Sequence, residues 1–154
     1  MNSREHQFIE DLGLLIEKSG GTRTLGRVFG YLLIVGKPKN LDEIAKDLLF
    51  SKATASLTIR QGLSARFFEK VSILGERKDS YRANTKAWIS SMSDRVNEMT
   101  EWQKVFDYGL SLLTPDNRTA MENLKGMKDY FDFMLWYLSD IDEQYELWKK
   151  GREQ

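Results

Sequence analysis

Histidine and cysteine, two side chains that often act as catalytic bases, nucleophiles and zinc ligands, are nearly absent from this sequence. His6 is the only histidine, it lies near one end of the chain, and none of the 154 residues is a cysteine. A catalytic dyad or triad built on histidine, a thiol nucleophile and a zinc site with cysteine ligands are therefore excluded. A pair of carboxylates remains open, but on its own it indicates no reaction. We expect a protein that is not an enzyme and that holds no cofactor or metal, and the lack of cysteine fits a reducing, cytoplasmic location.

Basic side chains, in contrast, gather in one part of the chain. The whole sequence has a net charge of zero, yet residues 22–86 contain 13 lysines and arginines against 6 acidic residues. The flanking segments, 1–21 and 87–154, are both acidic. Charge fluctuates along any chain, but a basic middle between acidic flanks is typical of a surface that binds a polyanion.

Two closely spaced helices are predicted inside the basic segment. Apolar residues three and four apart predict helices over 41–49 and 51–65, with Ser51 as the N-cap of the second. The same spacing predicts helices over 3–18 and 24–35 in front of them. Two glycines four residues apart in the helix over 24–35 indicate close packing against a neighbouring helix rather than a phosphate-binding loop.

The helix over 51–65 has two faces of different character. Ala55 and Ile59, followed by Gly62 or Leu63, form its buried stripe. The opposite face is small, polar or basic, and it consists of Ala53, Ser56, Leu57 and Arg60. Such a face suits a helix that lies in the major groove of DNA, whereas a face built only for solvent usually carries several Glu and Lys.

A β-hairpin is predicted directly after this helix. Residues that favour strands occupy 67–74 and 80–83, on either side of a turn over 75–79. A hairpin that follows the second helix of a helix-turn-helix is a wing. Its tip offers Arg77 and Lys78, whose side chains are long enough to reach phosphates or a minor groove.

The rest of the chain is predicted to be helical. One helix covers 86–113, and a second runs from Thr114, as its N-cap, and Pro115 to about residue 150. An unbroken heptad stripe of apolar residues runs through this last helix: Leu124, Met127, Phe131, Met134, Leu138, Ile141, Tyr145 and Trp148. Such a stripe requires a partner helix, which either the same chain or a second chain could supply.

Residues 23–83 resemble the winged helix-turn-helix of the MarR superfamily and are nearest its GbsR-type branch. Four stretches carry the resemblance in matching order and spacing: GRVFGYLL at 26–33, LDEIA at 41–45, SKATAS at 51–56 and GERKDSY at 75–81. Gly62 departs from the usual pattern. Because glycine costs about 1 kcal/mol of helix propensity relative to alanine, we expect the end of that helix to be bent or frayed.

The resemblance implies a mainly α-helical fold with a small β-hairpin wing. It assigns residues 1–21 to an N-terminal dimerisation helix, 22–85 to a winged helix-turn-helix DNA-binding domain and 86–154 to a C-terminal helical dimerisation region. It further implies a homodimer that controls transcription from a near-palindromic operator in double-stranded DNA, often through a small-molecule effector. Some relatives of this type are tied to choline or glycine-betaine metabolism.

The residues expected to bind DNA fall into two groups. Base contacts are expected from the exposed face of the second helix, through Ala53, Ser56, Leu57 and Arg60. Phosphate contacts, which make up most protein–DNA hydrogen bonds, are expected from Ser51, Lys52, Thr54, Arg77 and Lys78.

Two other interpretations remain open. A winged helix used only to bind protein predicts an apolar or acidic recognition face, which the basic wing argues against. Aromatic side chains in the C-terminal half could hold a quaternary ammonium ion by cation–π attraction, although aromatics at helical spacing are more often core or interface residues. These are Trp88, Trp102, Trp136, Tyr137 and Tyr145.

The longest apolar run, over 28–35, is too short to span a bilayer, so no membrane partner is expected.

Overall fold

The computed structural model describes residues 1–152, apart from the side chains of residues 91–93. The chain consists of two compact units, Met1–Trp88 and Ile89–Gln154. Residues 153 and 154, which belong to the expected dimerisation region over 86–154, lie outside the described residues.

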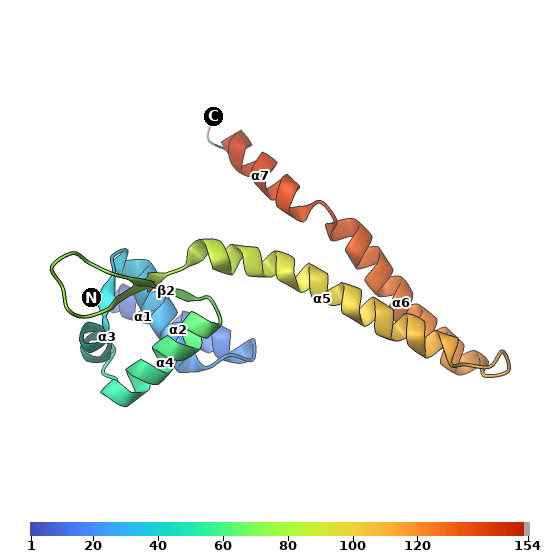
Figure 1. Ribbon diagram of the computed structural model, residues 1–154, viewed down its shortest axis with the longest axis horizontal. Coiled ribbons are helices and arrows are strands. Elements are labelled where there is room, and N and C mark those ends of the chain that lie inside the picture. The colour runs from blue at the N-terminus through green and yellow to red at the C-terminus, as the bar shows by residue number, and fades with distance from the viewer. Residues whose placement is uncertain (153–154) are drawn as a thin grey trace. The chain divides into compact units, whose positions relative to one another are not determined.

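The first unit combines four helices with a small antiparallel sheet (Figure 1). Its helices are α1 (Ser3–Lys18), α2 (Arg23–Val35), α3 (Leu41–Asp47) and α4 (Lys52–Ser64), and its strands are β1 (Lys39–Asn40), β2 (Phe68–Val71) and β3 (Ser80–Ala83). The strand order is β1-β3-β2. The mainly helical fold with a small β wing is thus confirmed. The sequence did not predict β1, whose two residues pair with Tyr81 and Ser80 of β3.

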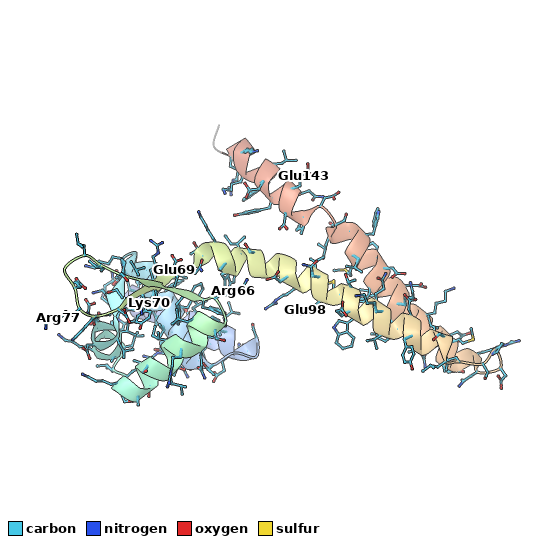
Figure 2. The ribbon with its side chains drawn as sticks, viewed as in Figure 1. Arg66, Glu69, Lys70, Arg77, Glu98 and Glu143 are labelled. Carbon is cyan, nitrogen blue, oxygen red and sulfur yellow. The ribbon has the colours of Figure 1, made fainter. Side chains whose placement is uncertain are left out.

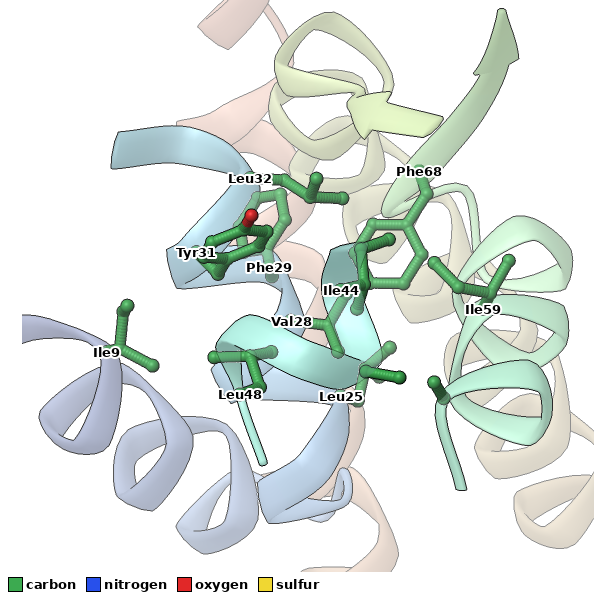
Figure 3. Packing of buried hydrophobic residues seen from close by; sticks show 12 residues of the cluster. Ile9, Leu25, Val28, Phe29, Tyr31, Leu32, Ile44, Leu48, Ile59 and Phe68 are labelled. Atoms are coloured by element: carbon green, nitrogen blue, oxygen red, sulfur yellow. The ribbon is translucent and has the colours of Figure 1, made fainter. Parts of the chain in front are cut away.

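A single apolar cluster holds the first unit together. Figure 3 shows side chains from α1, α2, α3, α4 and β2 converging on it, with Val28 and Ile44 fully buried at its centre. Phe29 packs edge-on against Phe67 and lies 6.4 Å from the ring of Phe68, so it joins α2 to the base of the wing. Burying side chains of this size contributes about 1.5–3 kcal/mol each. The helices that carry the candidate site are therefore fixed on a packed core.

Helices α1 and α2 approach each other through glycines. A Cβ atom on Gly26 would lie 2.7 Å from the Cα of Gly13, and one on Gly30 would lie 3.3 Å from the Cα of Ile9. Any larger residue at Gly26 would force the backbones apart. The prediction that Gly26 and Gly30 serve close helix packing is confirmed.

The second unit is built on an antiparallel helix pair, α5 (Thr85–Ser111) and α6 (Arg118–Leu138), which lie side by side in Figure 1. Phe131 of α6 stacks on Trp102 and Phe106 of α5, at ring-centroid distances of 5.9 Å and 5.7 Å. A hydrogen bond from Gln103 to Asp132 also joins the two helices. Helix α5 therefore covers the start of the heptad stripe within the same chain.

The prediction of one continuous last helix is wrong. The segment forms two helices, α6 and α7 (Ile141–Arg152), separated by a turn at Ser139 and Asp140. The Ser139 hydroxyl donates to the carbonyl of Trp136 at 3.0 Å, and serine side chains that bond to the backbone in this way compete with the helical ladder.

The N-cap of α6 is Asn117 rather than Thr114, because the Asn117 side chain accepts from the amide of Ala120 while Pro115 lies in a turn.

The extended segment predicted over 67–74 is shorter in the structure. Strand β2 ends at Val71, because the carbonyl of Ile73 already accepts a turn hydrogen bond from Glu76 and Gly75 adopts a left-handed conformation with φ 88°.

Among the described residues, no helix is both long and apolar enough to cross a membrane.

Candidate nucleic-acid interface

A tight turn sets α4 against α3. Residues 48–51 connect the two helices, and Leu49 takes a left-handed backbone conformation with φ 56°. The amide of Phe50 donates to the carbonyl of Ala45 at 2.8 Å, which closes the end of α3. Asn40 begins α3 with a capping box that includes Glu43, and the Ser51 side chain accepts from the amide of Thr54 to begin α4. The helix-turn-helix arrangement and the predicted N-cap at Ser51 are therefore present.

Helix α4 buries one face against the core. Ala55, Ile59 and Gly62 are buried, as the spacing predicts, and Thr58 is buried with them at 2% exposure. The burial of Thr58 could not be predicted from the sequence, because a threonine at a helical position is usually assigned to a polar face.

The outward face of α4 carries the residues predicted to contact bases. Ala53, Leu57 and Arg60 are exposed, and Ser56 is half-buried beside them. The guanidinium of Arg60 forms no ion pair or hydrogen bond with any described residue, so all its donors face solvent. An exposed arginine and leucine on one rigid helix face can address a guanine edge and a thymine methyl.

The first turn of α4 is more constrained. The hydroxyls of Ser51 and Thr54 lie 2.8 Å apart and hydrogen-bond to each other, and the Ser51 hydroxyl also serves the cap. Lys52 is 79% exposed, but its ammonium group is paired with Asp42 of α3 at 2.8 Å. Of these three residues, only Lys52 extends into solvent with a charge.

The wing presents the other two predicted residues in the loop between β2 and β3. Arg77 and Lys78 are both exposed, and Arg77 projects from this loop in Figure 2. Ion pairs from Lys70 to Asp79 and from Arg82 to Glu69 brace the strands below the loop. Arg77, like Arg60, has no ion pair or hydrogen bond within the part of the chain that the structure describes. Lys78 pairs with Asp42 at 2.6 Å.

Asp42 is a further residue of the interface that the sequence did not predict. Its two carboxylate oxygens accept from Lys52 and from Lys78, and these bonds lower the pKa of Asp42 to about 2. The same contact raises the pKa of Lys78. An aspartate in the first turn of a helix ordinarily indicates only a favourable interaction with the helix dipole, so nothing in the sequence signalled this pairing.

Other types of site find little support. Among residues 1–152, no group of three or more acidic or histidine side chains could hold a metal ion. Two aromatic residues considered for an ammonium cage have different neighbours, since Trp102 stacks on Phe131 and Tyr145 stacks on Trp148. All nine residues predicted to bind DNA belong to the first unit, seven at the cap or in α4 and two in the wing loop.

Comparison with known proteins identifies the family. A family model described as MmpR5-like MarR family transcriptional regulator matches residues 86–147. The HTH-type transcriptional regulator MmpR5 of Mycobacterium tuberculosis is 27% identical over 90% of this chain and 85% of its own length. The HTH-type transcriptional repressor OpcR of Bacillus subtilis is 34% identical over 92% of this chain and 84% of its own length. This chain belongs to the MarR-like family of helix-turn-helix transcriptional regulators.

A solved structure described as a transcriptional regulator extends the likeness to three dimensions. It is 26% identical and covers 94% of this chain and 99% of its own, with a TM-score of 0.71. Proteins of the MarR-like family regulate transcription and are not enzymes, as the sequence predicts for this chain. Helix α4 and the wing of this MarR-like protein carry all nine residues predicted to bind DNA.

Proposed function

We propose that this MarR-like protein binds duplex DNA through α4 and the wing, and that it does so as a homodimer. The DNA-binding proposal rests on two guanidinium groups, Arg60 on the outer face of α4 and Arg77 in the wing loop, that form no ion pair or hydrogen bond with the residues the structure describes. A long, exposed cation that has no partner among the described residues is ready to bond to a phosphate or a base.

The proposed contacts follow the two predicted groups of residues, except at Ser51 and Thr54. Ala53, Ser56, Leu57 and Arg60 contact bases in the major groove, while Arg77 and Lys78 of the wing and the charged end of Lys52 contact phosphates. Ser51 and Thr54 contribute mainly by fixing the start of α4, because their hydroxyls are already bonded to each other.

Exposed apolar side chains support the homodimer. No described residue of α6 or α7 is fully buried, and Trp136 and Tyr137 are 73% and 64% exposed. Both rings lie about 6 Å from that of Phe133, at 6.1 Å and 5.9 Å, so the three form one contiguous patch. Monomeric proteins rarely leave large contiguous apolar patches in water. A second copy of the chain, packed on these helices, would cover the patch.

A homodimer makes a specific demand on the DNA. Two recognition helices related by a two-fold axis require two half-sites about 34–36 Å apart, which is one turn of the duplex. Selection of bound duplexes from a random pool is expected to yield an inverted repeat with this spacing. A selected sequence with a single, unrepeated motif would contradict the dimeric arrangement.

The experiment that tests DNA binding is a salt titration on a random duplex. The double variant Arg77→Gln/Lys78→Gln is expected to lower the log–log salt slope by roughly two, about one for each phosphate that the wing no longer neutralises. The matched control, Lys149→Gln/Lys150→Gln in α7, removes the same charge and should leave the slope unchanged. If the wild-type protein binds no duplex at low salt, the alternative of a winged helix that binds only protein takes the place of this proposal.

We further propose that the protein belongs to the GbsR-type branch, works in the cytoplasm and responds to a small effector. The four stretches at 26–33, 41–45, 51–56 and 75–81 support the branch. An effector must bind two states of the protein with different affinity, so it must both stabilise the protein and change its affinity for DNA. A thermal-shift screen of cationic osmolytes and aromatic acids, followed by DNA titration with each hit, tests this. If no compound does both, regulation by a ligand of these classes is contradicted.

A further inference from the structure

One carboxylate connects three separate parts of the candidate interface. Asp42 lies in the first turn of α3, and its Oδ1 accepts from Lys52 at the start of α4 at 2.8 Å. Its Oδ2 accepts from Lys78 in the wing loop, 36 residues further along the chain, at 2.6 Å. The wing loop is thereby tied to the start of the helix proposed to enter the major groove.

This cluster contributes little to folding. The side chains of Asp42, Lys52 and Lys78 are 39%, 79% and 66% exposed, and ion pairs in such positions add little to stability and are screened by salt. A negative charge is also unfavourable where phosphates are to bind, because like charges repel across an interface. Asp42, like any aspartate with an ordinary pKa, is ionised at neutral pH, and the two lysines lower its pKa further. The position of this carboxylate therefore calls for a functional explanation.

We propose that Asp42 is a specificity-determining residue of the DNA-binding surface, because it ties the wing loop to α4 and competes with phosphates for Lys52 and Lys78. This inference rests on the proposed DNA binding. Asp42 need not touch DNA to act in this way. It acts through the two lysines and is therefore a positioning residue.

The ion pair between Asp42 and Lys78 affects binding to the operator and binding to a random duplex differently. Every duplex offers phosphates, so an untethered wing could bind the backbone of any sequence while α4 lies outside the groove. With Lys78 held near the start of α4, the wing reaches phosphates only in the register in which α4 also meets base edges. Penalising the competing binding mode is one of the two ways in which an interface gains specificity.

The variant Asp42→Asn tests the proposal, with Glu76→Gln as the matched control. Both changes remove one negative charge next to the same surface, but Glu76 lies in the wing loop and forms no ion pair with any described residue. Asp42→Asn is expected to raise affinity for a random duplex by about three- to tenfold, the combined worth of two exposed ion pairs, and to raise affinity for the selected operator less. Glu76→Gln should change both affinities by the same factor, which leaves their ratio as in the wild type.

A second comparison separates positioning from simple charge. In the background Lys52→Gln/Lys78→Gln, Asp42→Asn should no longer alter the ratio of operator to random affinity, since its two partners are gone. In the free protein, NMR order parameters of the amides of residues 76–79 should fall in Asp42→Asn and stay at the wild-type level in Glu76→Gln.

The outcomes distinguish this inference from the function on which it rests. If the wild-type protein binds no duplex at low salt, the proposed DNA binding fails. If the wild type binds but Asp42→Asn leaves the specificity ratio and the order parameters unchanged, the role of Asp42 is overturned. An equal change of the ratio in Asp42→Asn and Glu76→Gln would also overturn it, because the effect would then be one of net charge.

Discussion

Arg60 and Arg77 are chemically identical and neither has a partner in the described part of the chain, yet the elements that carry them differ. Arg60 stands on a helix fixed to the core through Ala55 and Ile59, whereas Arg77 lies in the wing loop. A base contact needs a fixed direction, while a phosphate contact tolerates variation. Arg60→Ala should therefore cost about 1–3 kcal/mol on the operator and flatten discrimination at one base position.

Arg77→Ala, in contrast, should weaken operator and random duplexes alike and lower the log–log salt slope by roughly one. Salt titrations of both variants on both duplexes measure the difference. Arg4→Ala in α1 serves as the control for loss of an exposed arginine. If Arg60→Ala and Arg77→Ala both match this control, neither arginine contacts DNA.

Gly62 has a structural role that the sequence did not indicate. The expectation that it bends or frays the end of α4 is wrong, since the helix continues to Ser64 and Gly62 is buried. A Cβ atom at this position would overlap the ring of Phe68 in β2. Glycine therefore lets the base of the wing pack directly against α4.

Gly62→Ala should accordingly destabilise the protein by about 1–3 kcal/mol, the usual cost of overpacking, even though alanine gains about 1 kcal/mol in helix propensity. Gly126→Ala in α6 is the control, because a Cβ there meets nothing within 4 Å and should stabilise the helix. Urea unfolding measures both changes. A stabilising Gly62→Ala would show that the ring of Phe68 can move aside without cost.

At the scale of elements, a buried hydroxyl positions the helix-turn-helix on the core. Tyr31 of α2 is fully buried, and its hydroxyl donates to Asp47 at the end of α3 at 2.5 Å. Burial, followed by the bond to Asp47, raises the pKa of Tyr31 well above the ordinary value of 10.0. The folded protein thus binds this proton more tightly than the unfolded chain does.

The pH dependence of stability follows from that sign. The contribution of Tyr31 is complete below about pH 10 and is lost as the pH rises above it, where the unfolded chain ionises first. Tyr31→Phe should lose about 1–3 kcal/mol at pH 7 and show a shallower decline in stability between pH 10 and 11. Urea unfolding at pH 7, 10 and 11 measures both effects on stability, with the exposed Tyr108→Phe as control. An unchanged alkaline decline in Tyr31→Phe would contradict the assignment.

Most elements of the first unit could be predicted because local signals agree there. The spacing of apolar residues located α1 to α4 to within about two residues, and Ser51 has the side chain that an N-cap requires. Strand β1 was missed because two residues after a proline form a strand only by pairing with β3. Asp42 was missed for a similar reason, since its partners lie 10 and 36 residues away in sequence.

The break between α6 and α7 shows the limit of spacing as a signal. The apolar period continues across Ser139 and Asp140, so the heptad pattern could not reveal the turn. The heptad pattern also could not show which helix covers the apolar stripe. Phe131 packs on α5 of the same chain, whereas Trp148 remains 57% exposed.

At the scale of the whole molecule, the two units differ in how they bury apolar residues. Every fully buried hydrophobic residue among those described lies between Ile9 and Phe68, within the first unit. The second unit has aromatic side chains but none that is fully buried in the described part of α6 and α7. Helices with exposed apolar faces of this kind gain stability when those faces pack against another helix.

This contrast determines which residues can test the homodimer. Phe131 and Leu138 belong to the heptad stripe, but Phe131 is stacked between Trp102 and Phe106, so a charge there would disrupt the chain's own helix pair. Trp136 and Tyr137 face solvent and make no such contact with α5 among the described residues. Trp136→Ser/Tyr137→Ser should therefore leave the helix content intact and weaken the dimer, since aromatic anchors at interfaces contribute about 2 kcal/mol or more each.

Sedimentation of the wild type and this double variant over a range of concentrations gives the measurement, and Leu74→Ser is the control. Leu74 is fully exposed in the wing, so its replacement removes an exposed apolar side chain outside the patch and should leave the dimer unchanged. A folded monomer retains one recognition helix and one wing but cannot hold a second pair in register. It should therefore keep most of its affinity for a random duplex and lose its preference for the inverted repeat, because only the dimer occupies two half-sites at once. If the double variant sediments as the wild type does, the exposed aromatic patch of α6 is not the dimer contact.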